Sequence, residues 1–322
     1  MRSAIALLSG LLALGALFAA PASAQSYPTR PVRVIVPFPA GGFTDVGARI
    51  VAQKLADVVG QPMVIENRAG ASGTLGVGEA VKSPPDGYTL LMTTGDFATV
   101  TALMPKMAFD PLTALIPVTR FVTVPLLLLT NPNSGVGSVK ELIEKAKAEP
   151  GKYAYASPGP GTINQLAAEW FALEAGIKLL HVPYKGGAQM ATGLAGGEIP
   201  LAVTTQGTVQ GLLEAGKIKS LSVLGRTRPS FLREMPSMAD SNLNVDAELN
   251  ISLYVPAGTP AEIVSRLDAG VLQVLRDEAI RKRFNELGMD VTPISQGALA
   301  ERLRSDAARY QRVIDQTGVK LN

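Results

Sequence analysis

Hydrophobic and polar residues alternate along the chain in short blocks that predict strands and helices in turn. Val32–Val36 is a β-branched run that predicts a buried strand, and Pro37–Gly42 ends it. In Thr44–Val59 the apolar residues recur at helical spacing, and Gly60 can close that helix. The next predicted elements are a strand at Met63–Glu66, a helix at Gly73–Lys82 and a strand at Tyr88–Thr93. This alternation predicts a parallel sheet covered by helices.

A second alternating series begins at a strongly apolar predicted strand, Val124–Thr130. The strands predicted after it are Tyr153–Ala156, Leu179–Val182, Ile199–Thr204 and Ser220–Leu224. The helices predicted between them are Ser138–Ala148, Thr162–Gly176, Gly187–Ala195 and Val209–Ala215. The chain then ends in a charge-rich tail with predicted helices at Pro260–Arg276, Glu278–Leu287 and Gln296–Thr317.

We interpret this organisation as two α/β lobes, with the second lobe inserted into the first. The first series is incomplete at about Phe121, and the C-terminal helices need a surface to cover. On this interpretation residues 25–123 and 250–322 form lobe 1, and residues 124–249 form lobe 2. A single larger doubly wound domain is the alternative.

The first 24 residues have the pattern of a secretory signal peptide. Arg2 precedes an apolar run at Ala4–Phe18, and Ala22–Ala24 has the small residues of a cleavage site before Gln25. A membrane anchor is the alternative. It is disfavoured because the run is shorter than the roughly 20 residues that a spanning helix needs. We therefore expect a protein that is exported to the periplasm and is soluble there once residues 1–24 are removed.

Composition narrows the possible chemistry. The chain has no cysteine, which excludes disulfides, thiolate catalysis, iron–sulfur clusters and cysteine-ligated zinc. Its one imidazole, His181, cannot build a site of several histidines. A net charge of +3 is too small to indicate nucleic acid. We expect no cofactor, no metal and no nucleic-acid partner.

Two glycine-bearing loops connect a predicted strand to a predicted helix, which is where open α/β sheets bind ligands. They are Pro37–Asp45 (PFPAGGFTD) and Ala156–Thr162 (ASPGPGT). Glycines let the backbone approach a ligand, and the N–H groups at a helix N-terminus suit an anion. Neither loop has the pattern of a dinucleotide or nucleoside triphosphate site. Ordinary turn chemistry is the alternative, and Thr162 with Gln165 also fits a capping box.

Four further polar residues are candidates. His181 could act as a general base and Lys185 could form a Schiff base, but no G-x-S-x-G elbow supplies a nucleophile. A structural histidine and a surface cation are the alternatives. Asp45 lies in the first turn of a helix, where it stabilises the dipole. Asp96 follows a predicted strand and faces either a cationic group or only solvent.

The segment Tyr27–Arg49 (YPTRPVRVIVPFPAGGFTDVGAR) resembles the opening of the Bordetella-uptake-gene (Bug) family. These are the periplasmic solute-binding proteins of tripartite tricarboxylate transporters. The resemblance continues in order through VIENRAGASG, DGYTLL, YASPGPGT, HVPYKG, GKIKSLSV and VPAGTPAEIVSR. It covers essentially the whole chain after the first 24 residues.

The resemblance implies a two-lobed type II periplasmic binding fold with a ligand cleft between the lobes. It implies a non-enzymatic receptor that closes over a small carboxylate and delivers it to the membrane subunits of the transporter. The carboxylate could be a di- or tricarboxylate, an amino acid or an aromatic acid. We expect a monomer. Two other functions stay open: an exported enzyme on the same fold that uses Lys185 or His181, and a ligand-sensing partner of a signalling system.

The resemblance also implies the site. In this family the second-lobe loop, here Ser157–Thr162, holds one carboxylate through backbone N–H groups and hydroxyls. The first-lobe loop, here Phe38–Gly42, holds the other side of the ligand, partly through water. The ligand-binding residues expected here are Phe38, Ala40, Gly41, Gly42, Asp45, Asp96, Ser157, Gly159, Gly161, Thr162, Lys185, Gly186 and Thr205.

Three departures from the family pattern leave the identity of the carboxylate open. Gln165 stands where the family often has histidine, and Thr204–Gln206 stands where many members carry an acidic residue. Gly95–Phe97 stands where small hydroxyl residues are usual. If Asp96 faces the cleft, it would repel a second carboxylate and favour a zwitterion or a monocarboxylate.

Overall fold

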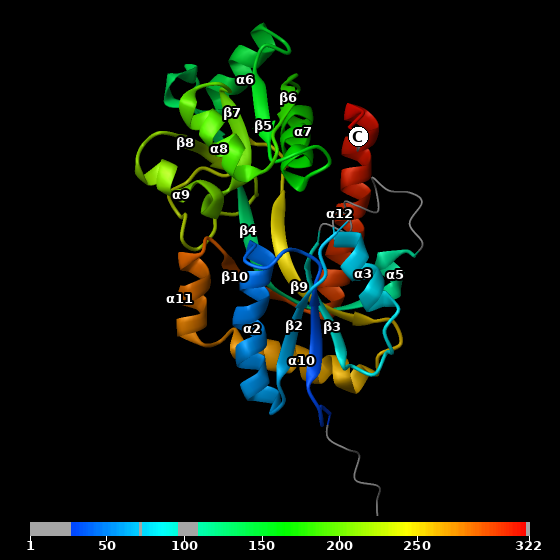
Figure 1. Cartoon of the computed structure of the whole chain (residues 1–322). Helices are drawn as coiled ribbons and strands as arrows, with labels where there is room; N and C mark the ends of the chain where they lie inside the picture. The colour runs from blue at the N-terminus through cyan, green and yellow to red at the C-terminus, as the bar shows by residue number, and fades with distance from the viewer. Residues whose placement is uncertain (1–26, 71–72, 96–108, 320–322) are drawn as a thin grey trace, which may run out of the picture.

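The computed structural model describes residues 27–70, 73–95 and 109–319 of the 322-residue chain. Residues 1–24, predicted as the signal peptide, and Asp96 therefore lie outside the described residues. Figure 1 shows two lobes of helices and strands, with β4 and β9 passing from one lobe to the other. The predicted α/β character is confirmed.

The first lobe is built on the strands β1 (Val32–Val36), β2 (Met63–Asn67), β3 (Thr89–Thr94), β9 (Glu248–Pro256) and β10 (Asp290–Ile294), with the first part of β4 (Leu115–Thr130). Its helices are α2 (Phe43–Val59), α3 (Thr74–Val81), α5 (Pro111–Ala114), α10 (Ala261–Val274), α11 (Glu278–Glu286) and α12 (Gln296–Thr317). The second lobe contains the end of β4 with β5 (Ala154–Ser157), β6 (Leu180–Pro183), β7 (Leu201–Thr205) and β8 (Lys219–Val223). Its helices are α6 (Val139–Ala148), α7 (Ile163–Ala175), α8 (Gly187–Gly196) and α9 (Gln206–Glu214), with short 3-10 turns at Pro132–Ser134 and Met238–Ser241.

One long strand, β4, belongs to both lobes. Its first part pairs with β9 as far as Pro125, which lies opposite Glu248. From Leu126 onwards it pairs with β7 and β8 instead. The strand order β2-β1-β3-β9-β4-β7-β5-β6 is therefore continuous across the molecule. The chain crosses from the first lobe to the second along β4 and returns at the start of β9.

Most predicted elements are confirmed to within one to three residues, but the prediction of a parallel sheet is only partly right. β1, β2 and β3 are parallel, as are β5, β6 and β7. β4 and β9 run antiparallel to their neighbours because they are the strands that cross between lobes. β4 begins at Leu115 rather than at the predicted Val124, and β9 and β10 were not predicted.

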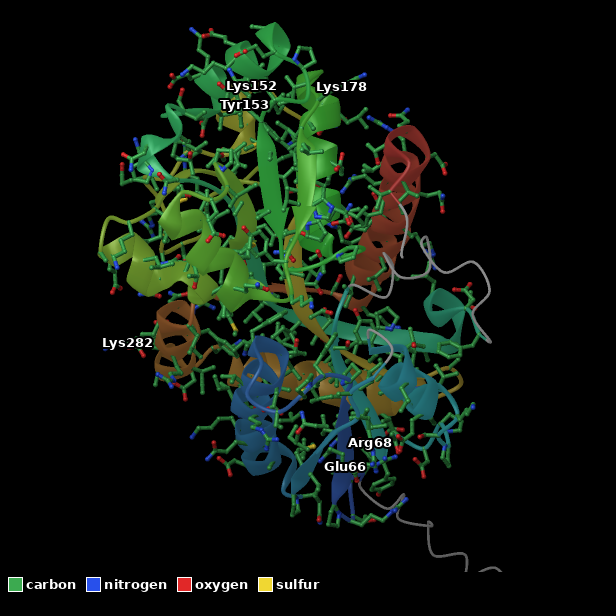
Figure 2. The ribbon with its side chains drawn as sticks, turned by 45° about the horizontal axis from the view of Figure 1, so that its top comes forward. Glu66, Arg68, Lys152, Tyr153, Lys178 and Lys282 are labelled. Carbon is green, nitrogen blue, oxygen red and sulfur yellow. The ribbon has the colours of Figure 1, made fainter. Side chains whose placement is uncertain are left out.

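The registers fix which way the strands point. β9 leaves the second lobe at Glu248, and β3 is antiparallel to it, so the carboxyl end of β3 points toward the second lobe. β1 and β2 are parallel to β3 and end on the same side. In the second lobe Thr205, at the end of β7, lies opposite Leu126, so β7 and its parallel partners β5 and β6 point back toward the first lobe. Figure 2 agrees, because Lys152 and Lys178, just before β5 and β6, lie at the outer end of the second lobe. The two sets of carboxyl ends therefore face each other.

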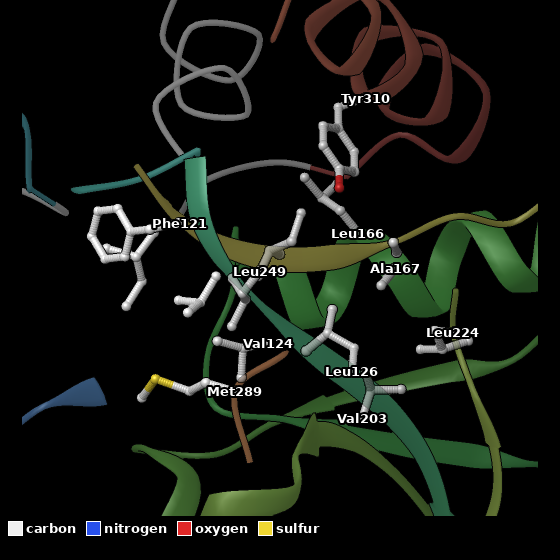
Figure 3. Close-up of a cluster of buried hydrophobic side chains, with 14 of the residues drawn as sticks. Phe121, Val124, Leu126, Leu166, Ala167, Val203, Leu224, Leu249, Met289 and Tyr310 are labelled. Atoms are coloured by element: carbon white, nitrogen blue, oxygen red, sulfur yellow. The ribbon is translucent and has the colours of Figure 1, made fainter. Parts of the chain in front are cut away.

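One of the buried apolar clusters runs through the crossing point. Val124 and Leu249 of the crossing strands lie in one cluster with Met289 of the first lobe and with Leu126 and Val203 of the second. Figure 3 shows these side chains arranged along β4, with Tyr310 of α12 near Leu166 of α7 on the other side. Burial of this kind contributes about 25 cal/mol for each Å² of apolar surface. The core therefore joins the lobes at the crossing strands.

α12 also joins the two lobes. Its last turns pack on α7, where the Tyr310 and Trp170 rings meet edge to face with centroids 6.3 Å apart. Arg309 lies over the Trp170 ring, and Arg312 pairs with Glu174 at 2.7 Å. The C-terminal part of the segment predicted as lobe 1 therefore contacts lobe 2 directly.

Candidate functional site

The loop after β1 is held in shape by the first turn of α2. Gly41 has φ +82°, a conformation that favours glycine, and its N–H donates to Asp45 Oδ2 at 2.9 Å. Gly42 is the N-cap of α2 and offers no side chain to the helix N–H groups. Ala40, Gly41 and Gly42 are exposed. The loop thus presents backbone at a helix N-terminus on the side that faces the second lobe.

The carboxylate of Asp45 is occupied within the protein. The side chain is 3% exposed, Oδ2 also accepts from Arg49 Nε at 2.9 Å, and Oδ1 accepts from Asn67 Nδ2 at 2.9 Å. Asn67 Nδ2 donates to Phe38 O as well. Burial raises the pKa of Asp45, but the hydrogen bonds from Arg49, Gly41 and Asn67 outweigh it and the net pKa is lowered. Asp45 therefore positions the loop. Its predicted role in ligand binding becomes an indirect one, through the shape of that loop.

Apolar side chains flank the same loop. Phe43, at the start of α2, is 37% exposed, and Leu75, at the start of α3, is 56% exposed. Phe38 is half-buried against Gly73, where an added Cβ would lie 3.3 Å from its ring. The first-lobe edge therefore combines backbone N–H groups with apolar surface.

The loop after β5 has its polar groups satisfied internally. Ser157 is completely buried, and its hydroxyl lies 2.9 Å from Gly159 O and 2.7 Å from His181 Nε2. The Thr162 hydroxyl donates to Gly159 O at 2.8 Å. The Gly161 N–H donates to Gln165 Oε1 at 2.7 Å. Several groups predicted to bind a carboxylate are thus engaged within the protein.

His181 is a partner of the loop. Its ring stacks on Tyr155 at 5.0 Å between centroids, and burial lowers its pKa. Tyr155 lies opposite His181 in the pairing of β5 with β6, which brings the ring to Ser157. The distance to Ser157 fits a nucleophile and base, but a fully buried hydroxyl is closed to a substrate.

A third loop, after β6, lies against the second. The Gly186 N–H donates to Pro158 O at 2.9 Å, and the Lys185 N–H donates to Gln189 Oε1 at 3.2 Å. Lys185 is exposed, and Gly186 is the N-cap of α8 with φ +102° and no capping side chain. The predicted residues Ser157, Gly159, Lys185 and Gly186 thus lie on adjacent loops.

Beside the crossing strands, the ends of β3 and β7 carry buried polar atoms that have no hydrogen-bond partner among the described residues. Thr94 is 1% exposed, and its Oγ1 has no hydrogen bond. Gln206 Oε1, directly after β7, is also buried without a partner, and the Cβ of Gln206 lies near Gly288 of the first lobe. Next to it, Thr205 Oγ1 lies 3.0 Å from Thr208 Oγ1. Sequence reasoning missed Thr94, although a polar residue at the carboxyl end of a buried strand is a usable signal.

Within residues 27–70, 73–95 and 109–319, no group of three or more acidic or histidine side chains could hold a metal ion. In the same residues no helix is both long and apolar enough to cross a membrane.

Comparison with known proteins places this geometry in a family. The profile of the tripartite tricarboxylate transporter family receptor matches residues 47–319. Protein BugT of Bordetella pertussis is 34% identical over 321 residues, covering 97% of each chain. The structure of R. palustris Rpa4515 with adipate has a TM-score of 0.77 at 32% identity, covering 91% of this chain and 99% of that one. MatC from Rhodopseudomonas palustris with bound malate has a TM-score of 0.72 at 26% identity, covering 89% and 100%.

Proposed function

This chain belongs to the tripartite tricarboxylate transporter receptor family, and we propose that it captures a small carboxylate in the periplasm for such a transporter. Its two-lobed fold is that of the periplasmic binding proteins of this family. Its relatives are solute-binding proteins. Delivery to membrane subunits, export by removal of residues 1–24 and a monomeric state are parts of the proposal.

The observation that carries the proposal is the direction of the strands. The carboxyl ends of β1, β2 and β3 face those of β5, β6 and β7, and each set leads into helix N-termini. Backbone N–H groups there favour an anion without a basic side chain. Adipate and malate in the two related structures are both carboxylates, which supports the same class of ligand here.

We retain the predicted site, with roles adjusted to the geometry. The loops Ala40–Gly42 and Gly159–Thr162 would approach the carboxylate, with Phe38, Lys185, Gly186 and Thr205 around it. Because the Gly41 and Gly161 N–H groups already have partners, the donors would be N–H groups in the first turns of α2 and α7. Asp45 and Ser157 would act by holding their loops. We also retain lobe 1 as residues 25–123 with 250–322 and lobe 2 as residues 124–249, which puts the hinge at the crossing strands.

The energetics are adequate for such a site. A hydrogen bond to a charged carboxylate contributes about 1.5–3 kcal/mol, so four contribute about 6–12 kcal/mol. Micromolar affinity requires about 8 kcal/mol after the costs of association. Lobe closure would exclude water and strengthen each bond.

Calorimetry tests the proposal. We expect citrate, adipate, malate, glutamate or benzoate to bind with micromolar or tighter affinity and to raise the melting temperature by mass action. The same mixtures, assayed for chemical change, address the alternative of an enzyme that uses Lys185 or His181. Turnover of a compound without a saturable binding isotherm for any carboxylate would contradict the proposal. If the protein instead serves a signalling system, the carboxylate-bound protein should capture a sensor domain and not the transporter subunits.

A further inference from the structure

The side chain of Gln165 lies at the N-terminus of α7 with its amide in one fixed orientation. It is the third residue of the helix, and Oε1 accepts from the Gly161 N–H at 2.7 Å. Since Oε1 is the acceptor, Nε2 must be the other end of the amide. Gln165 is 6% exposed, so its rotamer is restrained by its surroundings.

The donor end of this amide has no partner. Among residues 27–70, 73–95 and 109–319, no acceptor bonds Gln165 Nε2. Gln206 Oε1 and Thr94 Oγ1 are buried atoms without a partner, whereas Gln165 Nε2 is not among the buried atoms and so retains contact with solvent. A nine-tenths buried side chain therefore keeps a donor at the solvent, at the helix end that faces the first lobe. An unpaired donor beside the positive end of a helix is suited to an anion.

The donors next to Gln165 already have hydrogen-bond partners within the protein, which leaves Gln165 as one of the few donors free for a ligand. The Gly161 N–H is bonded to Gln165 itself, and the Thr162 hydroxyl donates to Gly159 O. The Gln165 N–H is capped by the Thr162 hydroxyl, so what remains at this end of α7 is the N–H groups of Ile163 and Asn164 and the Gln165 side-chain amide.

We infer that Gln165 Nε2 donates directly to the ligand carboxylate and makes this residue a determinant of affinity and charge selectivity. The inference rests on the proposed function and adds a residue to its site. A neutral amide donates to a carboxylate without adding negative charge to the site, whereas a carboxylate side chain at position 165 would repel an anionic head group.

Gln165→Glu separates a ligand contact from a purely structural role. In α6 of the same chain, Glu141 occupies the equivalent position and accepts from the Gly137 N–H at 2.8 Å. A glutamate at 165 would therefore keep the bond that shapes the loop. Glu169, one helical turn further on, adds a small repulsion. We expect a melting temperature within a few degrees of wild type, but affinity for the tightest-binding carboxylate of the calorimetry panel weakened at least a hundredfold.

Two other variants complete the test. Gln165→Met removes the donor without adding charge, but it also removes the acceptor of the Gly161 N–H. We therefore expect at least tenfold weaker binding together with a lower melting temperature. Gln53→Glu adds the same charge on the exposed face of α2, and we expect affinity within threefold of wild type.

The outcomes are distinct. Wild-type affinity in a folded Gln165→Glu protein, or an equal loss in Gln53→Glu, would overturn the inference while leaving the proposed function in place. If Gln165→Glu melts below the assay temperature, unchanged affinity in Gln165→Met overturns it. If wild type binds none of the five carboxylates, the proposed function fails and this inference fails with it.

Discussion

Arg120→Met is expected to lower the free energy of unfolding by about 3–5 kcal/mol, the usual cost of leaving one member of a buried ion pair alone. Arg120 Nη1 lies 2.8 Å from Glu248 Oε1, and the two side chains are 11% and 20% exposed. They join β4 to β9 where the chain crosses between lobes. Burial raises the pKa of Glu248 even with Arg120 present. Without Arg120, the carboxylate keeps only the longer contact to Arg302, at 3.8 Å.

Chemical unfolding monitored by circular dichroism measures this effect. Arg228→Met is the matched control, because the Arg228–Asp240 pair is 44% and 42% exposed, and we expect it to cost about 1 kcal/mol or less. Adding Glu248→Gln to Arg120→Met should recover much of the loss, since it removes the unpaired charge. A loss below 1 kcal/mol in the single variant would show that the pair does not stabilise the crossing.

Asp45→Asn is expected to cost about 2–4 kcal/mol at pH 7, because it replaces a buried carboxylate that accepts three hydrogen bonds. If the remaining oxygen serves Gly41 and Arg49, the new NH₂ group faces the NH₂ of Asn67. Asn67 cannot turn over without breaking its own bonds to Phe38 O and Arg49. The first-lobe loop should therefore loosen, and carboxylate affinity should fall with stability.

The pH dependence gives this prediction a second signature. The net pKa of Asp45 is lowered on folding, so its contribution is fully present above the ordinary aspartate pKa of about 4 and is lost as the pH falls from there through the lowered pKa of the folded protein. The difference in unfolding free energy between wild type and Asp45→Asn should shrink between about pH 5 and pH 2. A difference that stays constant over that range would show that the Asp45 charge does not hold the loop.

The local elements could be predicted because their signals are local. Val32–Val36 and the helix after it follow from apolar spacing and from Gly60, and the structure places them within one residue of the prediction. β9 was missed although Leu249, Ile251 and Leu253 alternate with polar residues, a pattern of period two. The antiparallel crossing strands could not be predicted from alternation with helices, because strand direction depends on partners far along the chain.

In the candidate site, too, the local features could be predicted from the sequence and the long-range contacts could not. The two glycine loops could be found from composition and position, and the structure turns both toward the boundary between lobes. Their internal partners could not be found, because Asn67 lies 22 residues from Asp45 and His181 lies 24 residues from Ser157. Such pairings depend on strand register, which sequence spacing does not reveal. They decide which donors are left for a ligand.

The central claim, that a carboxylate is held between the facing strand ends, is tested most directly by a crystal structure with the tightest-binding carboxylate of the panel. The account predicts carboxylate oxygens within hydrogen-bond distance of the first turn of α7 and of Gln165 Nε2, with the other end of the molecule against the loop of Phe38–Gly42. A carboxylate seated instead at the outer hollow lined by Asn131, Thr192 and Lys217, with both glycine loops vacant, would contradict it.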